Sequence, residues 1–268
     1  MGRLECEEPG HGRQTDFSLV DGLASVGPRN TSRGLSAAVI LSVQSSLRPR
    51  TIVPCMRLNT FLFDLDGTLL DHFKAIHRCH THTMRQLGLP LPTMAQVHAA
   101  VGAGLETALA RLVGPERVKE ALPIYCAHWD ATMLDDVELL PGARELILAL
   151  CAAGGRCAVF TNKRGDSSRL LCDHLGLTPH LAGIFGAHDT PWLKPDPAFA
   201  RHVLEQLSAK AATTGLVGDS TYDFEAARNG GLEFYGVTTG THTAEQLRAA
   251  GAGNVYPDLV ALTPVLLG

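Results

Sequence analysis

Short apolar runs alternate along this chain with longer segments in which apolar residues recur every three or four positions. The run Phe61-Leu62-Phe63 is typical of a strand that is buried on both faces, as in the centre of a parallel sheet. From Pro141 onward the alternation is regular. It predicts strands at 157–161, 184–186, 215–217, 234–237 and 255–256, and helices at 142–153, 167–175, 197–207, 222–229 and 244–250. Such alternation indicates right-handed βαβ units. The predicted fold class is therefore α/β, with a Rossmann-like three-layer core around a parallel sheet.

A helical pattern interrupts the core after its first strand. It runs from about Phe73 to Glu138 and is divided by glycines and prolines at 88–92, 102–104 and 114–115. Ninety-four residues lie between Asp66 and Thr161, whereas a crossover between parallel strands needs only about a dozen. The sequence therefore predicts an inserted α-helical cap domain at 73–138, with the core formed by 56–72 and 139–268.

Residues 1–55 differ in composition from the remainder. They are rich in Gly, Ser, Arg and Pro and show no helical or strand periodicity. The early acidic residues Glu5, Glu7 and Glu8 argue against both a signal peptide and a transit peptide. We expect a disordered extension, or a start assigned upstream of a true start at Met56.

Composition narrows the possible partners and compartment. The net charge is −4 without a basic stripe, which argues against nucleic acid as a partner. The strongly apolar run Ala37–Leu41 is far too short to span a bilayer. Seven cysteines form no C-x-x-C pair, as expected of reduced thiols in a cytosolic protein. We expect a cytoplasmic protein without membrane contact, either a monomer or a homodimer.

Two carboxylates directly follow the first predicted strand. Asp64 and Asp66 are two residues apart, so on an extended chain both side chains point to the same side. Carboxylates this close repel each other unless a cation or a shared proton intervenes. Mg²⁺ binds through one or two carboxylates together with substrate phosphate oxygens. Gly67 permits a sharp turn at the end of the strand, where open α/β sheets bind their ligands.

Further polar residues follow other predicted strands. Thr161 and Asn162 offer a hydroxyl and free backbone amides for phosphate oxygens, although Thr-Asn alone is common turn chemistry. Lys194 is held outside the helical region by the following proline, and its charge can neutralise a phosphate. Asp219 ends the strand at 215–217, and Asp223 lies one helical turn later. The alternative for this last pair is helix capping.

In this order the four segments resemble the four motifs of the haloacid dehalogenase (HAD) superfamily, specifically Asp64-Leu65-Asp66-Gly67-Thr68, Thr161-Asn162, Lys194-Pro195 and Gly218-Asp219 through Asp223. The resemblance covers essentially residues 57–268. It implies a Mg²⁺-dependent phosphoric monoester hydrolase that works through an aspartyl-phosphate, and it assigns a role to each residue.

The implied roles divide between chemistry and binding. Asp64 is the nucleophile, and Asp66 is a protonated general acid that later acts as a base. Mg²⁺ is held by the side chains of Asp64 and Asp219 and by the backbone carbonyl of Asp66. Asp223 orders metal-bound water. The phosphate is bound by Gly67, Thr161, Asn162 and Lys194.

The substrate is expected to be selected by the cap. Gly102 and Gly104 form a Gly-x-Gly loop before a helix, where backbone amides can approach a small anion; the alternative is a plain interhelical turn. With 88–92 it resembles the cap of phosphoglycolate phosphatases. This implies a small phosphorylated metabolite as substrate, with 2-phosphoglycolate as the leading candidate.

Three alternatives remain. β-Phosphoglucomutases carry a hinge histidine that falls, by direct counting, on Ile76, beside His77. The second alternative is pyrophosphatase activity. The third, a non-catalytic interaction module, is disfavoured because the motif carboxylates and lysine are all present.

A group of cap residues, His72, His77, Cys79, His80 and His82, lacks a complete set of metal ligands, so a solvated or hinge-lining helix is favoured over a transition-metal site.

Overall fold

A computed structural model describes residues 57–268 of the protein. The prediction of a disordered extension or misassigned start at 1–55 lies outside the described residues. The strands are β1 (Thr60–Phe63), β2 (Leu70–Asp71), β3 (Glu138–Leu139), β4 (Arg156–Arg164), β5 (Leu181–Ala187), β6 (Thr214–Gly218), β7 (Glu233–Val237) and β8 (Val255–Tyr256). The α-helices are α1 (Phe73–Gln86), α2 (Met94–Ala100), α3 (Leu105–Val113), α4 (Val118–Thr132), α5 (Ala143–Ala152), α6 (Gly165–His174), α7 (Pro197–Gln206), α8 (Thr221–Gly230), α9 (Ala244–Ala249) and α10 (Leu259–Leu267). Short 3₁₀ turns are η1 (Pro115–Arg117), η2 (Thr178–His180) and η3 (Ala211–Thr213).

Six strands form one parallel sheet in the order β5-β4-β1-β6-β7-β8. β1 lies between β4 and β6, and Phe63 is in register with Val159 and Val217. All four residues of β1 are buried. The apolar run therefore forms a central strand, as its composition predicts.

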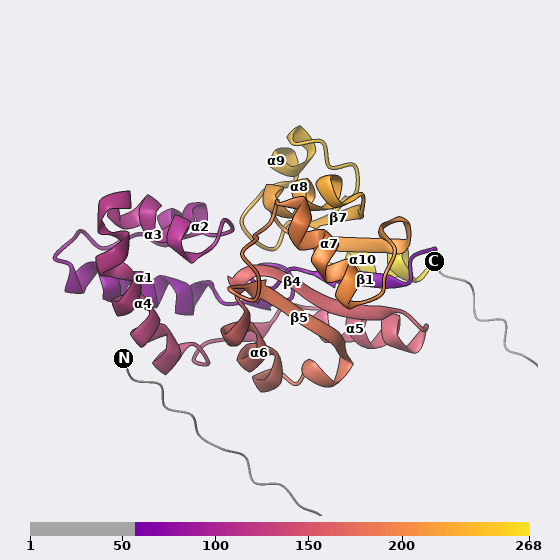
Figure 1. Ribbon diagram of the computed structural model, residues 1–268, viewed down its shortest axis with the longest axis horizontal. Helices are drawn as coiled ribbons and strands as arrows, with labels where there is room; N and C mark the ends of the chain where they lie inside the picture. Colours follow the sequence, from indigo (N-terminus) through magenta and orange to yellow (C-terminus); the bar gives the residue numbers. More distant parts are fainter. Residues whose placement is uncertain (1–56) are drawn as a thin grey trace, which may run out of the picture. The chain divides into compact units, whose positions relative to one another are not determined.

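Helices cover both faces of this sheet, and Figure 1 shows α5 on one side with α7 and α8 on the other. Side chains of β1 alternate between the two layers. Phe61 and Phe63 pack with α5 and α10, whereas Leu62 packs with α7, α8 and α9. The predicted α/β class with a Rossmann-like three-layer core is confirmed.

Helices α1–α4 form a third apolar cluster, the helical module, which is inserted between β2 and β3 (Figure 1). Its interior contains Leu109, Tyr125 and Trp129, all nearly fully buried. β2 and β3 pair antiparallel at the two ends of the insertion. This pairing closes a long excursion with a few hydrogen bonds and anchors both connections at the same point.

Several local predictions differ from the structure. Glu138 was assigned to the helical module but begins β3. β4 continues to Arg164, three residues beyond the predicted end at 161. The short pair β2–β3 and the helix α10 were not predicted. α10 is apolar around most of its circumference and contains Pro264, so it lacks the amphipathic period by which a surface helix is recognised. Among the described helices, none is both long and apolar enough to cross a membrane.

Candidate active site

The carboxyl ends of β1, β4 and β6 meet at one edge of the sheet, because these strands are parallel neighbours. Asp64 directly follows β1, and Asp219 directly follows β6. The Asp64 N–H donates to the carbonyl of Val217 at 3.0 Å, which extends the pairing by one residue and fixes the start of the turn. The strand order thus brings together segments that are more than 150 residues apart in the sequence.

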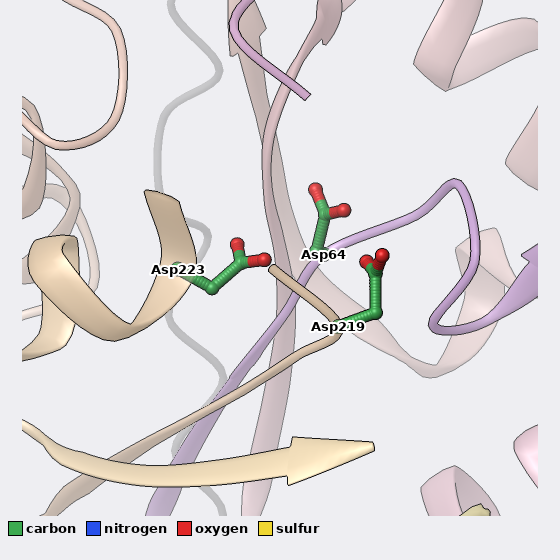
Figure 2. A group of neighbouring side chains, drawn as sticks. All are labelled: Asp64, Asp219 and Asp223. Carbon is green, nitrogen blue, oxygen red and sulfur yellow. The ribbon is translucent and has the colours of Figure 1, made fainter. Parts of the chain in front are cut away.

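Three carboxylates converge at this edge (Figure 2). One oxygen each of Asp64, Asp219 and Asp223 lies within 4.8 Å of the others. Asp219 and Asp223 are buried, and burial raises the pKa of Asp64 to about 6 and that of Asp219 to about 7. Repulsion from Asp223 adds to both shifts, whereas Lys194 opposes the shift of Asp64. A cluster of buried oxygens that resists ionisation is well suited to a hard divalent cation.

Lys194 supplies the only positive charge that directly contacts this cluster within the described residues. Its Nζ donates to Asp64 Oδ1 at 2.7 Å, to Asp223 Oδ1 at 2.6 Å and to the carbonyl of Phe160 at 2.9 Å. Lys194 is 4% exposed, and despite its burial the two carboxylates raise its pKa above the ordinary value. All three hydrogens of the ammonium therefore have acceptors, so its position is fixed before any ligand binds.

Both carboxylate oxygens of Asp223 are hydrogen-bonded to protein groups. The residue is fully buried, its carboxylate binds Lys194, and its Oδ2 accepts from the backbone N–H and the hydroxyl of Ser220. Ser220 in turn caps α8, so the pair forms a capping box. Asp219, the other capping candidate, is not the cap. The predicted role of Asp223 in ordering metal-bound water stays a prediction, but its observed partners are Lys194 and the start of α8.

The loop after β7 orients Asp219. The backbone N–H and hydroxyl of Thr241 donate to Asp219 Oδ2 at 2.7 and 2.8 Å. The Thr68 hydroxyl donates to Asp219 Oδ1 at 3.1 Å. Sequence reasoning missed Thr241 because no motif marks it. Its position after a strand of the predicted parallel sheet was the available signal.

Asp66 is turned toward a different partner. Lys163 Nζ donates to its two oxygens at 3.1 and 2.8 Å, and His72 Nδ1 lies 3.6 Å from Asp66 Oδ1. Burial opposes ionisation, but the Lys163 ammonium together with His72 holds the pKa of Asp66 well below its ordinary value. These contacts favour the ionised form of Asp66 in the absence of substrate, and its role as a protonated general acid stays a prediction for the substrate complex. Lys163 was not singled out from the sequence.

Of the predicted phosphate-binding residues, Gly67 and Thr161 lie at the site, whereas the side chain of Asn162 already has protein partners. Gly67 has φ +82°, and Thr161 is buried at the end of the site with its hydroxyl accepting from the Lys163 N–H at 3.2 Å. The Asn162 side chain is already occupied, because its Nδ2 donates to the carbonyls of Gly102 and Lys194 and its Oδ1 accepts from the Lys194 N–H. The Asn162 side chain thus links the backbone of Lys194 to the carbonyl of Gly102, in the loop before α3.

A cavity of about 90 Å³ lies between the sheet edge and the helical module. Its floor includes Asp64, Asp66 and Asp219, and its roof comes from α1, α3, α4 and the loop before α3. The predicted loop residues Gly102 and Gly104 both line it. A Cβ on Gly102 would lie 3.2 Å from the ring of Tyr222, so this loop rests directly on α8.

The cap histidines are separated in space. His77 Nε2 lies 2.9 Å from the carbonyl of Pro92, His80 lines the cavity, and His82 stacks on His128 with ring centroids 4.0 Å apart. Ile76, at the counted position of a mutase hinge histidine, also lines the cavity. His72 lies beside Asp66, so the four histidines of this group occupy four separate environments.

Comparison with known proteins agrees with this geometry. Residues 61–237 match the family described as haloacid dehalogenase-like hydrolase. The chain is 34% identical to "Probable phosphatase IndB" of Dickeya dadantii (strain 3937), over 70% of this chain and 85% of that one. It is 29% identical to a phosphoglycolate phosphatase of Vibrio cholerae serotype O1, over 76% and 95%. The crystal structure of a "predicted phosphoglycolate phosphatase" from Haemophilus somnus 129PT shares the fold, with a TM-score of 0.74 at 21% identity, covering 79% of this chain and 99% of that chain.

Proposed function

The chain belongs to the haloacid dehalogenase-like hydrolase family, and from this premise we propose that it is a Mg²⁺-dependent phosphatase that forms an aspartyl-phosphate on Asp64. The phosphatase names of its relatives support a phosphoric monoester hydrolase. The observation that carries the proposal is the convergence of three carboxylates and one buried lysine beside a cavity.

The side chains of Asp64 and Asp219 would hold Mg²⁺, together with the backbone carbonyl of Asp66, and Asp223 would order metal-bound water. When bound, the ion supplies charge stabilisation for the phosphoryl oxygens and relieves the repulsion among the carboxylates. Lys194 contributes a second fixed positive charge beside Asp64, which lowers the cost of bringing a phosphate dianion to a carboxylate nucleophile.

Asp64 attacks phosphorus as the bond from phosphorus to the leaving oxygen breaks. Asp66 donates a proton to that oxygen and later accepts one from the attacking water. Since Asp66 is ionised beside Lys163 in the ligand-free arrangement, it must gain this proton after the substrate binds. An entering phosphate dianion competes for the Lys163 ammonium and raises the pKa of Asp66, so protonation is coupled to substrate binding.

The size of the cavity favours a small substrate. The cavity of about 90 Å³ is well below the range of roughly 300–1,000 Å³ for sites that hold drug-sized ligands. Together with the phosphoglycolate phosphatase relative, this favours a small phosphorylated acid or sugar, with 2-phosphoglycolate as the first candidate. The mutase alternative is weakened because Ile76, not His77, lines the cavity.

The test is phosphate release from a panel of esters with and without Mg²⁺. We expect turnover that EDTA stops and Mg²⁺ restores, with 2-phosphoglycolate preferred by kcat/KM over β-glucose 1-phosphate and pyrophosphate. If either competitor is preferred by tenfold or more, about 1.4 kcal/mol in transition-state binding, the substrate assignment is wrong. Turnover that is independent of metal would count against the site itself.

A further inference from the structure

The roof of the cavity is almost entirely apolar. The helical module contributes Ile76, Val101, Leu105, Ala108 and the rings of Tyr125 and Trp129 to it. The only N–H of Trp129 already donates to Ser167 Oγ at 3.2 Å. Among the roof side chains, hydrogen-bonding capacity for a ligand is therefore confined to His80 and Tyr125.

His80 is buried, and one of its ring nitrogens, Nδ1, has no hydrogen-bond partner within the described residues. The residue is 1% exposed, and its ring stacks at a tilt on Tyr125 with centroids 4.7 Å apart. Nδ1 is also enclosed. Burial lowers the pKa of His80 to about 4, so the ring is neutral at pH 7 and carries one proton.

The location of that proton follows from the cost of burial. An enclosed N–H without an acceptor is rarer and more costly than an enclosed acceptor without a donor. Nδ1 is therefore the bare nitrogen, and the proton sits on Nε2. A neutral donor in an apolar roof binds an oxygen without adding a charge to the site.

We propose that His80 is a specificity-determining residue whose Nε2–H donates to an oxygen on the leaving group of the substrate. The leaving group is then a short alcohol that carries a further hydroxyl or carboxylate oxygen, while its carbon atoms contact Ile76 and Trp129. This inference rests on the proposed phosphatase function and extends it from the phosphoryl group to the leaving group.

The experiment compares two phosphate esters of equal size with uncharged leaving groups, 2-hydroxyethyl phosphate and n-propyl phosphate, which differ by one hydroxyl in place of a methyl group. A site built to bind the hydroxyl should favour the first by at least about tenfold in kcat/KM. His80→Phe keeps a ring against Tyr125 but removes the donor, so the ratio of kcat/KM for the two esters should fall to about one. His80→Gln, which carries an amide N–H, should keep part of the preference.

Two controls locate the effect. Tyr125→Phe removes the hydroxyl of the other polar roof side chain, and His82→Phe alters the helix of His80 away from the cavity. Both variants should leave the preference intact. If His80→Phe does not fold, His80→Met is the size-matched partner of the Gln variant. A wild type that turns over both esters equally overturns the inference, as does a preference that survives His80→Phe or disappears with Tyr125→Phe. A wild type inactive on both esters but active on 2-phosphoglycolate overturns the inference alone, whereas one that is also inactive on 2-phosphoglycolate and p-nitrophenyl phosphate overturns the phosphatase proposal as well.

Discussion

Replacing Lys194 by methionine tests the charge balance of the site directly. The ammonium is buried and contacts Asp64 and Asp223, of which Asp223 is fully buried. Methionine keeps much of the length and apolar bulk of the lysine stem but removes the charge. In metal-free protein it leaves a cluster of carboxylates without a neutralising cation.

Two arguments give a similar magnitude. Breaking a buried ion pair by removing one partner costs about 3–5 kcal/mol. The cluster can also relieve itself by taking up a proton on one carboxyl. At pH 7 this costs about 4 kcal/mol for a carboxyl whose ordinary pKa is 3.8. We therefore expect Lys194→Met to lower the free energy of unfolding by about 4 kcal/mol at pH 7.

The same argument gives a pH dependence with a definite sign. In the variant, the folded-state pKa of that carboxyl lies above its unfolded value, so the folded state binds more protons. The variant therefore gains stability as pH falls from 7 toward the unfolded pKa, by about 1.4 kcal/mol per pH unit. Because the raised pKa values of Asp64 and Asp219 make the wild type take up protons over the same range, the sign is read from the variant itself, which should gain about 2 kcal/mol between pH 7 and pH 5.5.

The assay is urea unfolding followed by circular dichroism, at pH 7 and pH 5.5 in EDTA. Lys210→Met, a change at an exposed lysine, is the matched control and should stay within about 0.5 kcal/mol of wild type. A deficit for Lys194→Met below about 1 kcal/mol at pH 7, or a variant whose free energy of unfolding does not rise as pH falls to 5.5, would refute the reasoning.

Three further outcomes are expected. Asp64→Asn should abolish phosphate release while leaving the melting temperature within a few degrees of wild type, because an amide cannot act as the nucleophile; retained turnover would defeat the mechanism. Gly240→Ala should sharply reduce Mg²⁺ affinity in calorimetry, because its Cβ would lie 2.2 Å from a carboxylate oxygen of the cluster, whereas Gly253→Ala, which meets nothing within 4 Å, should not. Arg111 of α3 donates to the hydroxyl of Tyr222 of α8 at 2.8 Å. A double-mutant cycle of Arg111→Leu and Tyr222→Phe on KM should therefore give a nonzero coupling, and additive effects would exclude this contact as a cap-to-core link.

The sequence predicted the residues at the strand ends because their positions follow from topology. Once Phe61-Leu62-Phe63 is a central parallel strand, the residues that follow β1, β4 and β6 must meet at one edge. Asp64, Thr161 and Asp219 were therefore predictable from the order of their strands. Thr241 follows the same rule, but its residue type carries no distinctive signal.

Side-chain partners within that edge were less predictable. Asn162 was expected to bind phosphate, which stays a prediction, and the partners of its side-chain amide, the backbone groups of Lys194 and Gly102, were not foreseen. The carboxylate of Asp223 accepts hydrogen bonds from Lys194 and Ser220, two partners that its spacing from Asp219 did not reveal. In each case a local backbone group or a fixed lysine competes for the polar side chain, and sequence spacing does not reveal which partner prevails.

The state of Asp66 shows where reasoning from the motif ends. Motif order alone favours a protonated Asp66 next to an ionised Asp64. In the fold, Lys163 reaches Asp66 while its Nζ also lies 4.3 Å from the ring centroid of Trp129, a residue of the helical module. The aromatic face favours a cation at that point, and so helps to hold the lysine beside the carboxylate. Trp129 lies more than sixty residues from Asp66 in the sequence, so the charge on the acid–base candidate depends on how the inserted helices pack over the sheet. Movement of the module that separates Trp129 from Lys163 would weaken this hold, so cap position and the protonation of Asp66 are physically linked.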